Sequence, residues 1–313
     1  MQKSDVSEIL KSTYEQVISN SGGQLASYIP ELANIKPDLF AISYVDVHGH
    51  QISIGDCESL FTLQSTSKPI TYSLALQLKG EEFVHSKVGV EPTGEAFNSI
   101  IELEEKSHRP FNPMINSGAI ATTSLIEGID FNSKLELILN HFEKFVGHKL
   151  TIDEKVFASE KNTAHRNRAI AHLMKHFEVI DSDIEETLDL YFKQCSILVN
   201  CNDLAMIAGT MANRGIQPKT RQQVMSADHV VQTLSLMFSC GMYDTAGEWA
   251  FRVGLPAKSG VSGALFVVVP GQFGLAVYSP RIDEHGHSVR GRKAVELIAK
   301  KLNVNIFKSV SKE

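Results

Sequence analysis

The chain has few of the residues that mark several common protein classes. Cysteine occurs four times in 313 residues and never as Cys-x-x-Cys, so we expect reduced thiols and no disulfide framework. Basic runs are missing and the formal net charge is −6, which argues against nucleic acid as a partner. The cysteines are Cys57, Cys195, Cys201 and Cys240.

Long hydrophobic runs are also missing. The most apolar stretch, residues 264–269, is far too short to cross a bilayer, and no apolar segment follows Lys3. We therefore expect a cytoplasmic protein that has no membrane partner.

Histidine pairs occur three times, but the residues around them do not complete a metal site. A bound metal needs a third and a fourth ligand in register, and no His-Glu-x-x-His or Cys-x-x-Cys pattern supplies them. We therefore expect neither a metal nor another cofactor. The pairs are His48 with His50, His172 with His176, and His285 with His287.

Apolar periodicity separates a central helical stretch from strand-rich ends. A helix is predicted over 5–19, and strands over 40–47 and 51–54 flank a turn at 48–50. A helix from Ser65 runs to Gly80, and further helices are predicted over 116–126, 133–145, 166–177, 185–194, 202–213 and 229–238. After Trp249 we expect strands over 251–255, 262–269 and 273–279, then a helix over 289–302.

This order of elements predicts an α+β fold. One antiparallel sheet would form from both ends of the chain and be flanked by the N- and C-terminal helices. We expect an α/β lobe from residues 1–75 and 241–313 and an all-helical lobe from 76–240. Small-molecule sites form preferentially in clefts, so we expect the site between these lobes.

The segment Ser65-Thr-Ser-Lys68 puts a hydroxyl and an ammonium on one helical face. Lysine can take the serine proton only when burial or nearby positive charge lowers its pKa. The same spacing recurs at Ser309 and Lys312 in a polar tail, and a helix N-cap is the alternative role for Ser65. The pair therefore needs support from other segments.

That support comes from Lys258-Ser-Gly260, the only K-[ST]-G in the chain, at the start of a strand predicted to continue to 269. S-x-x-K followed by K-[ST]-G is the order found in penicillin-recognising serine enzymes. Their third motif, Ser-Asp-Asn, is missing. The pattern indicates their fold but argues against β-lactam substrates.

Several longer segments resemble the serine-dependent glutaminases over roughly residues 24–300. The resemblance implies a β-lactamase-like fold, cofactor-free hydrolysis of L-glutamine to L-glutamate and ammonia, and a homodimer or homotetramer. Ser117 and Ser262 depart mildly from the family pattern, where Ala and Gly are expected. The segments are 27–32, 112–120, 157–160 with 166–170, 190–192, 240–244 and 254–261.

The resemblance also implies roles for individual residues. Ser65 would be the nucleophile and Lys68 its proton partner, while the Ser65 and Val261 N–H groups would form the oxyanion hole. The phenols of Tyr28 and Tyr243 would lie near the reacting carboxamide, and which of Lys68 and these tyrosines is the general base stays open. The substrate would be held by Asn116, Glu160, Asn167 and Tyr191, with Ser65, Tyr243 and Val261 also in contact.

These residue types suit free glutamine, which has an ammonium and a carboxylate at one end and a neutral amide at the other. Glu160 can accept hydrogen bonds from the ammonium, and neutral amides and a phenol can donate hydrogen bonds to the carboxylate. Two alternatives remain: a penicillin-recognising serine hydrolase of the same fold, and a non-catalytic amino-acid sensor. A sensor would need a broken catalytic set, whereas Ser65 and Lys68 are both present.

Overall fold

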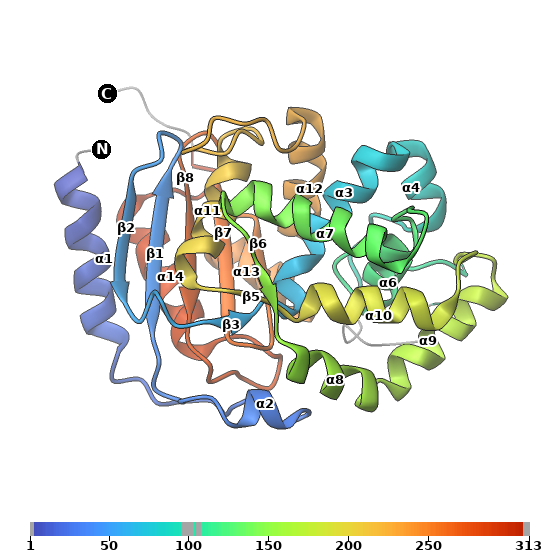
Figure 1. Ribbon diagram of the computed structural model, residues 1–313. Helices are drawn as coiled ribbons and strands as arrows, with labels where there is room; N and C mark the ends of the chain where they lie inside the picture. The colour runs from blue at the N-terminus through green and yellow to red at the C-terminus, as the bar shows by residue number, and fades with distance from the viewer. Residues whose placement is uncertain (1–2, 95–102, 104–107, 309–313) are drawn as a thin grey trace.

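The computed structural model describes residues 3–94, 103 and 108–308 (Figure 1). The pair Ser309 and Lys312 lies outside the described residues. Among the described residues, no helix is long and apolar enough to span a membrane. The four cysteines are buried and free.

A five-stranded antiparallel sheet joins the two ends of the chain, as expected. Its strand order is β2-β1-β8-β7-β6, so the N-terminal β1 pairs directly with the C-terminal β8. Every residue of β7 and β8 is buried, which explains why these strands are continuously apolar and do not alternate. The strands are β1 Ala41–Asp46, β2 Gln51–Gly55, β6 Ala257–Ser259, β7 Ala264–Val269 and β8 Phe273–Tyr278.

Helices cover both faces of this sheet, because successive strand side chains point to opposite sides. Ile42, Leu265 and Val277 belong to one core with α1 (Lys3–Val17) and α14 (Val289–Leu302). Phe266 and Ala276 belong to the other core, with α11 (Cys201–Ala212). At Gly274 a Cβ atom would lie 2.2 Å from the Gly209 nitrogen of α11, so the close approach of helix and sheet requires glycine.

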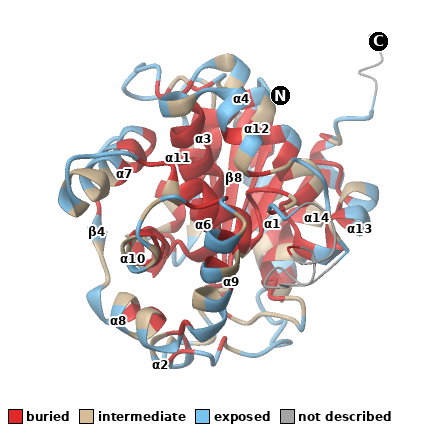
Figure 2. Ribbon diagram, turned by 90° about the vertical axis from the view of Figure 1, so that its right-hand side faces the viewer, coloured by how far each residue is buried: buried red, intermediate tan, exposed pale blue. Residues whose placement is uncertain are grey.

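Most of the remaining helices, among them α3, α4 and α6 to α10, form the part of the molecule that lies away from α1, whereas α13 packs in the core with α1 and α14 (Figure 1). Buried residues concentrate in α3 and α11, whereas α8 shows more exposed surface (Figure 2). A second, three-stranded antiparallel sheet has the order β3-β5-β4. The helices are α2 Pro30–Ala33, α3 Lys68–Lys79, α4 Glu81–Lys87, α6 Asn116–Ser124, α7 Phe131–Val146, α8 Glu154–Thr163, α9 His165–His176, α10 Ile184–Cys195, α12 Ala227–Cys240 and α13 Ala246–Arg252, and the short strands are β3 Phe61–Thr62, β4 Thr151–Ile152 and β5 Ile197–Val199.

Three predicted elements differ in the structure. Residues 251–255 are not a strand, because α13 runs through Arg252 and buries Trp249. Lys258 and Ser259 belong to their own edge strand, β6, and do not begin β7. Ser65 lies in a 3₁₀ turn, η1 (Gln64–Ser67), and α3 begins only at Lys68.

Candidate active site

One cavity of about 320 Å³ gathers side chains from both parts of the molecule. The predicted residues that line it are Tyr28, Ser65, Asn116, Glu160, Asn167, Tyr191 and Val261. Lys68 and Tyr243 do not line it, but each contacts a residue that does. The lining residues that the sequence analysis did not single out are Gln64, Thr163, Ala164, Arg166 and Cys195.

Ser65 sits at the start of a strained connection between β3 and α3. The preceding residue, Gln64, has φ +49°, a left-handed value that costs a non-glycine residue roughly 1–3 kcal/mol. Ser65 is 8% exposed, whereas Thr66 and Ser67 are fully buried. The turn therefore leaves only the first of these three hydroxyl side chains at the cavity.

Lys68 is the first residue of α3 and lies behind the cavity wall with 1% of its surface exposed. Burial lowers the pKa of its ammonium to about 8. Its Nζ donates a 2.7 Å hydrogen bond to Asn116 Oδ1 on α6. Near neutral pH this lysine can therefore lose its proton far more easily than an exposed lysine.

Tyr243 begins a second 3₁₀ turn, η2 (Tyr243–Thr245), and also has a left-handed φ of +51°. Its hydroxyl donates to Ser259 O at 3.0 Å and hydrogen bonds to the Ser65 side chain. Burial raises its pKa, so the phenol keeps its proton at neutral pH. The fully buried Lys258 lies 4.2 Å from the centre of its ring, and Lys258 Nζ donates to Ser259 O at 2.8 Å.

Three neutral groups form a hydrogen-bonded set on the helical side of the cavity. Asn116 Nδ2 donates to Asn167 Oδ1 at 3.2 Å, and Tyr191 OH donates to Asn116 Oδ1 at 3.3 Å. These side chains come from α6, α9 and α10. Because Asn116 also accepts from Lys68, one amide joins these neutral groups to the lysine.

Glu160, on α8, is the acid of the cavity and is 9% exposed. Burial raises the pKa of its carboxyl group, opposed by hydrogen bonds from Tyr28 and Gln64. Tyr28 OH lies 2.8 Å from Glu160 Oε1 and 3.1 Å from Gln64 Oε1, although 47% of the Tyr28 surface is exposed. A bound ammonium would therefore meet a desolvated carboxylate whose neighbours already orient it.

Ser65 and Val261 also line the cavity, and their backbone N–H groups are the candidates for an oxyanion hole. Among the described residues, neither donates to a backbone carbonyl. Val261 follows Gly260, whose own N–H donates to Ala264 O at 2.9 Å and so closes the turn between β6 and β7. Two residues that line one cavity thus have N–H groups without a backbone acceptor, which is the kind of donor that an oxyanion hole uses.

The residues that sequence analysis missed lie beside those it found. Gln64 precedes Ser65, and Arg166 precedes Asn167. Cys195 lies one helical turn beyond Tyr191, so the i, i+4 rule could have found it. Within the described ranges, no cluster of three or more His, Cys, Asp or Glu side chains could hold a metal ion.

Comparisons with known proteins find similarity to glutaminases over nearly the whole chain. The family model described as "Glutaminase" matches residues 23–307. A glutaminase of Trichormus variabilis is 51% identical over 305 residues, which cover 97% of this chain and 91% of that protein.

Solved structures give the same result. One described as "Probable glutaminase ybaS" superposes with a TM-score of 0.97 at 41% identity and covers 99% of this chain and 100% of that one. Another, described as Mglu in its glutamate form, has a TM-score of 0.94 at 36% identity and covers 99% of this chain and 72% of that one. The chain belongs to the glutaminase family.

Proposed function

We propose that this protein hydrolyses L-glutamine to L-glutamate and ammonia through an acyl-enzyme on Ser65. The family membership supports the reaction. The observation that most strongly supports the serine mechanism is the low pKa of Lys68, about 8, one helical turn from a serine at the cavity. That is the condition under which a lysine can act as a base.

Glu160 would bind the substrate ammonium, and Asn116 and Asn167 would donate to its carboxylate, joined by Tyr191 once its hydroxyl turns from Asn116 to the substrate. A charged acceptor together with amide donors suits a zwitterion, whose ammonium and carboxylate need partners of opposite kind. The related structure described as Mglu in its glutamate form supports an amino acid as the ligand. The side-chain amide would then reach Ser65 and the two backbone N–H groups.

In the first step, Ser65 Oγ would attack the amide carbon while its proton passes to Lys68, directly or through Tyr243. We favour Lys68 over Tyr28 and Tyr243 as the base, because burial lowers the lysine pKa and raises the pKa of Tyr243. The pKa of Tyr28 is also raised, because its hydroxyl end is desolvated beside the Glu160 carboxylate although the rest of the side chain is half exposed. The Ser65 and Val261 N–H groups would hold the oxyanion. The C–N bond then breaks as the leaving nitrogen takes the proton, which yields ammonia and a γ-glutamyl ester.

In the second step, water would attack the ester carbonyl with Lys68 again as the base. The ester C–O bond breaks, Ser65 recovers its proton, and glutamate leaves. Each step uses the same lysine and the same oxyanion donors. No group other than these residues and water is needed to balance the reaction.

The test is ammonia release from glutamine and asparagine by the wild type and by Ser65→Ala. We expect turnover of glutamine by the wild type and only background by the variant. Full activity of Ser65→Ala would reject the serine mechanism, and absence of wild-type turnover would reject the function. Acylation of Ser65 by a β-lactam, or binding of glutamine without turnover, would support the two alternatives instead.

Four further expectations from the sequence, namely the fold family, the two lobes, the location and the assembly, stay proposals. We propose that the fold is β-lactamase-like, with lobes at 1–75 plus 241–313 and at 76–240. We also propose a cytoplasmic homodimer or homotetramer. Sedimentation equilibrium would measure the assembly, and a monomer at micromolar concentration would reject that part.

A further inference from the structure

The loop at residues 283–287 lies directly against Tyr243. Asp283 Oδ1 accepts from the backbone N–H of His285 at 3.0 Å and of His287 at 2.9 Å, and Asp283 N donates to His287 O at 2.8 Å. A Cβ atom on Gly286 would lie 3.5 Å from Val261 and 3.8 Å from the Tyr243 ring. The loop is therefore internally fixed and borders two residues of the proposed site.

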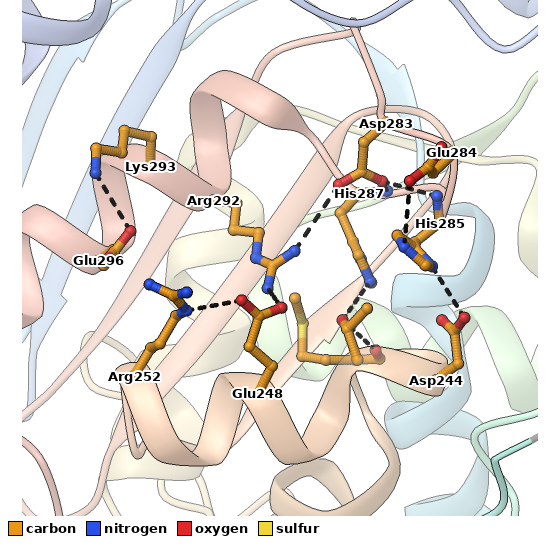
Figure 3. A network of polar contacts seen from close by, with 12 residues as sticks. Asp244, Glu248, Arg252, Asp283, Glu284, His285, His287, Arg292, Lys293 and Glu296 are labelled. Carbon is orange, nitrogen blue, oxygen red and sulfur yellow. Dashed lines mark hydrogen bonds and ion pairs between the residues drawn. The ribbon is translucent and has the colours of Figure 1, made fainter.

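His287 connects this loop to η2 from inside the protein core. Its side chain is fully buried, and its ring lies nearly parallel to that of Tyr243, with centroids 5.1 Å apart. Its Nε2 is 2.9 Å from Thr245 Oγ1, at the other end of η2. Figure 3 shows His287 pointing from the loop toward this turn, and His285 reaching Asp244, where His285 Nδ1 and Asp244 Oδ2 are 2.9 Å apart.

The hydrogen bonds fix the tautomer of His287. Thr245 Oγ1 donates its only proton to Met242 O at 2.9 Å, so it must accept from His287. Nε2 therefore carries the imidazole proton, and Nδ1, which has no partner among the described residues, is bare. Burial lowers the pKa of His287 to about 4, so this neutral tautomer persists at neutral pH.

Tyr243 needs such support, because its φ of +51° is unfavourable for an aromatic residue. A strained residue keeps its conformation only where neighbouring structure holds it. The hydroxyl that contacts Ser65 is at the far end of this side chain. A small rotation of η2 would move it away from the reacting atoms.

We propose that His287 is a positioning residue for the reaction at Ser65: its ring and its Nε2–H hold the Tyr243–Thr245 turn so that the Tyr243 hydroxyl stays against the Ser65 side chain. This inference rests on the proposed function. It predicts an effect on the rate of the chemical step and little effect on substrate binding. His287 itself does not contact the cavity.

The experiment compares two changes at His287 with a change at its hydrogen-bond partner. His287→Phe keeps a ring but loses the donor, His287→Gln keeps a donor but loses the ring, and Thr245→Val removes the acceptor. His141→Phe is the matched control, because His141 is also buried, has Nε2 at 2.8 Å from a hydroxyl (Ser73) and contacts one aromatic ring (Phe145). The readouts are kcat, KM for glutamine and the melting temperature.

We expect His287→Phe to lower kcat by about 10- to 100-fold with KM changed less than about twofold, since small displacements of a reacting group have effects of this size. His287→Gln and Thr245→Val should lower kcat by a smaller factor. The control His141→Phe should lower the melting temperature while its kcat stays near that of the wild type. Wild-type kcat in His287→Phe would overturn the proposal, as would a KM that rises in proportion to the loss of rate. Should His287→Phe fail to fold, wild-type kcat in Thr245→Val would overturn it.

The two proposals fail in different ways. A wild type that releases no ammonia from glutamine rejects the proposed function. A wild type that turns over glutamine, together with His287 variants of undiminished kcat, rejects only the positioning role.

Discussion

The two sides of the cavity are built differently. Ser65 and Tyr243 lie on short 3₁₀ turns, each turn has one left-handed non-glycine residue, and two lysines are buried behind them. We call this the reaction side. We call the other group the recognition side after its proposed role; it consists of Asn116, Glu160, Asn167 and Tyr191, all on α-helices.

The difference indicates where the fold tolerates unfavourable features. Burial disfavours the charged form of Lys68, and the two turns contain backbone conformations that are unfavourable for non-glycine residues. The reaction side therefore lowers the free energy of unfolding. The recognition side has ordinary helical backbone and joins its neutral groups by hydrogen bonds. Changes on the reaction side should therefore lower kcat, and changes on the recognition side should raise KM.

The largest effect should follow removal of the nucleophile. Ser65→Ala should reduce kcat by at least about 10⁴-fold, because a serine hydrolase without its nucleophile keeps only the contributions of binding and the oxyanion hole. Ammonia release and the affinity for glutamine should be measured together. A variant that loses affinity as strongly as rate would break the separation between the two sides.

Removal of the lysine should give the next largest effect on rate. Lys68→Met should lower kcat by about 10²- to 10⁴-fold, the usual contribution of a general base. In the wild type, kcat should rise with pH and level off above about 8, as Lys68 loses its proton. A wild-type profile that is flat from pH 6 to 9 would count against Lys68 as the base.

The same variant should be more stable than the wild type. The folded-state pKa of Lys68 is lowered from 10.5 to about 8, so the unfolded chain binds more protons between these values and wild-type stability rises with pH there. Lys68→Met should therefore gain up to about 3 kcal/mol below pH 8, and the gain should fade toward pH 10.5. Urea unfolding at pH 7 and pH 10 measures it. A variant less stable than the wild type would show that burial of Lys68 does not lower the free energy of unfolding.

On the recognition side, Glu160→Gln should raise KM by about 10- to 100-fold, because a hydrogen bond to a charged group contributes about 1.5–3 kcal/mol. Its kcat should change much less. Since burial raises the pKa of Glu160, KM of the wild type should also increase as pH falls and the carboxylate is protonated. A loss confined to kcat would move Glu160 to the reaction side.

The smallest effect on KM should come from a change at Tyr28. Its hydroxyl contacts Glu160 on the recognition side and Gln64, the residue before Ser65, on the reaction side. Tyr28→Phe removes one hydrogen bond of about 0.5–1.5 kcal/mol, so we expect KM to rise about 2- to 10-fold. A much larger loss of kcat would instead place this phenol in the proton transfer.

Much of the fold could be predicted because the elements are long and regular. The helix predicted over 289–302 matches α14, and the strands on either side of the turn at 48–50 are β1 and β2. Residues 251–255 were predicted wrongly because Phe251, Val253 and Leu255 alternate as in a strand. Phe251 is in fact 90% exposed at the end of a seven-residue helix, too short to show its period.

The cavity was less predictable in its geometry than in its residues. The segments around Ser65 and Glu160 indicated which residue types would meet, and the structure brings them to one cavity. The left-handed turns at Gln64 and Tyr243 depend on tertiary contacts that leave no local signal. The contacts of His287 could not be predicted for the same reason, because its partners Thr245 and Tyr243 lie 42 and 44 positions earlier in the chain.

The most direct test of the central claim is the covalent intermediate. Wild type and Ser65→Ala would be mixed with glutamine, quenched in acid during turnover, digested and analysed by mass spectrometry. We predict one γ-glutamyl ester in the wild type, on the peptide that contains Ser65, and neither ester nor ammonia release above background in the variant. An unmodified Ser65 peptide together with undiminished turnover by Ser65→Ala would contradict the account.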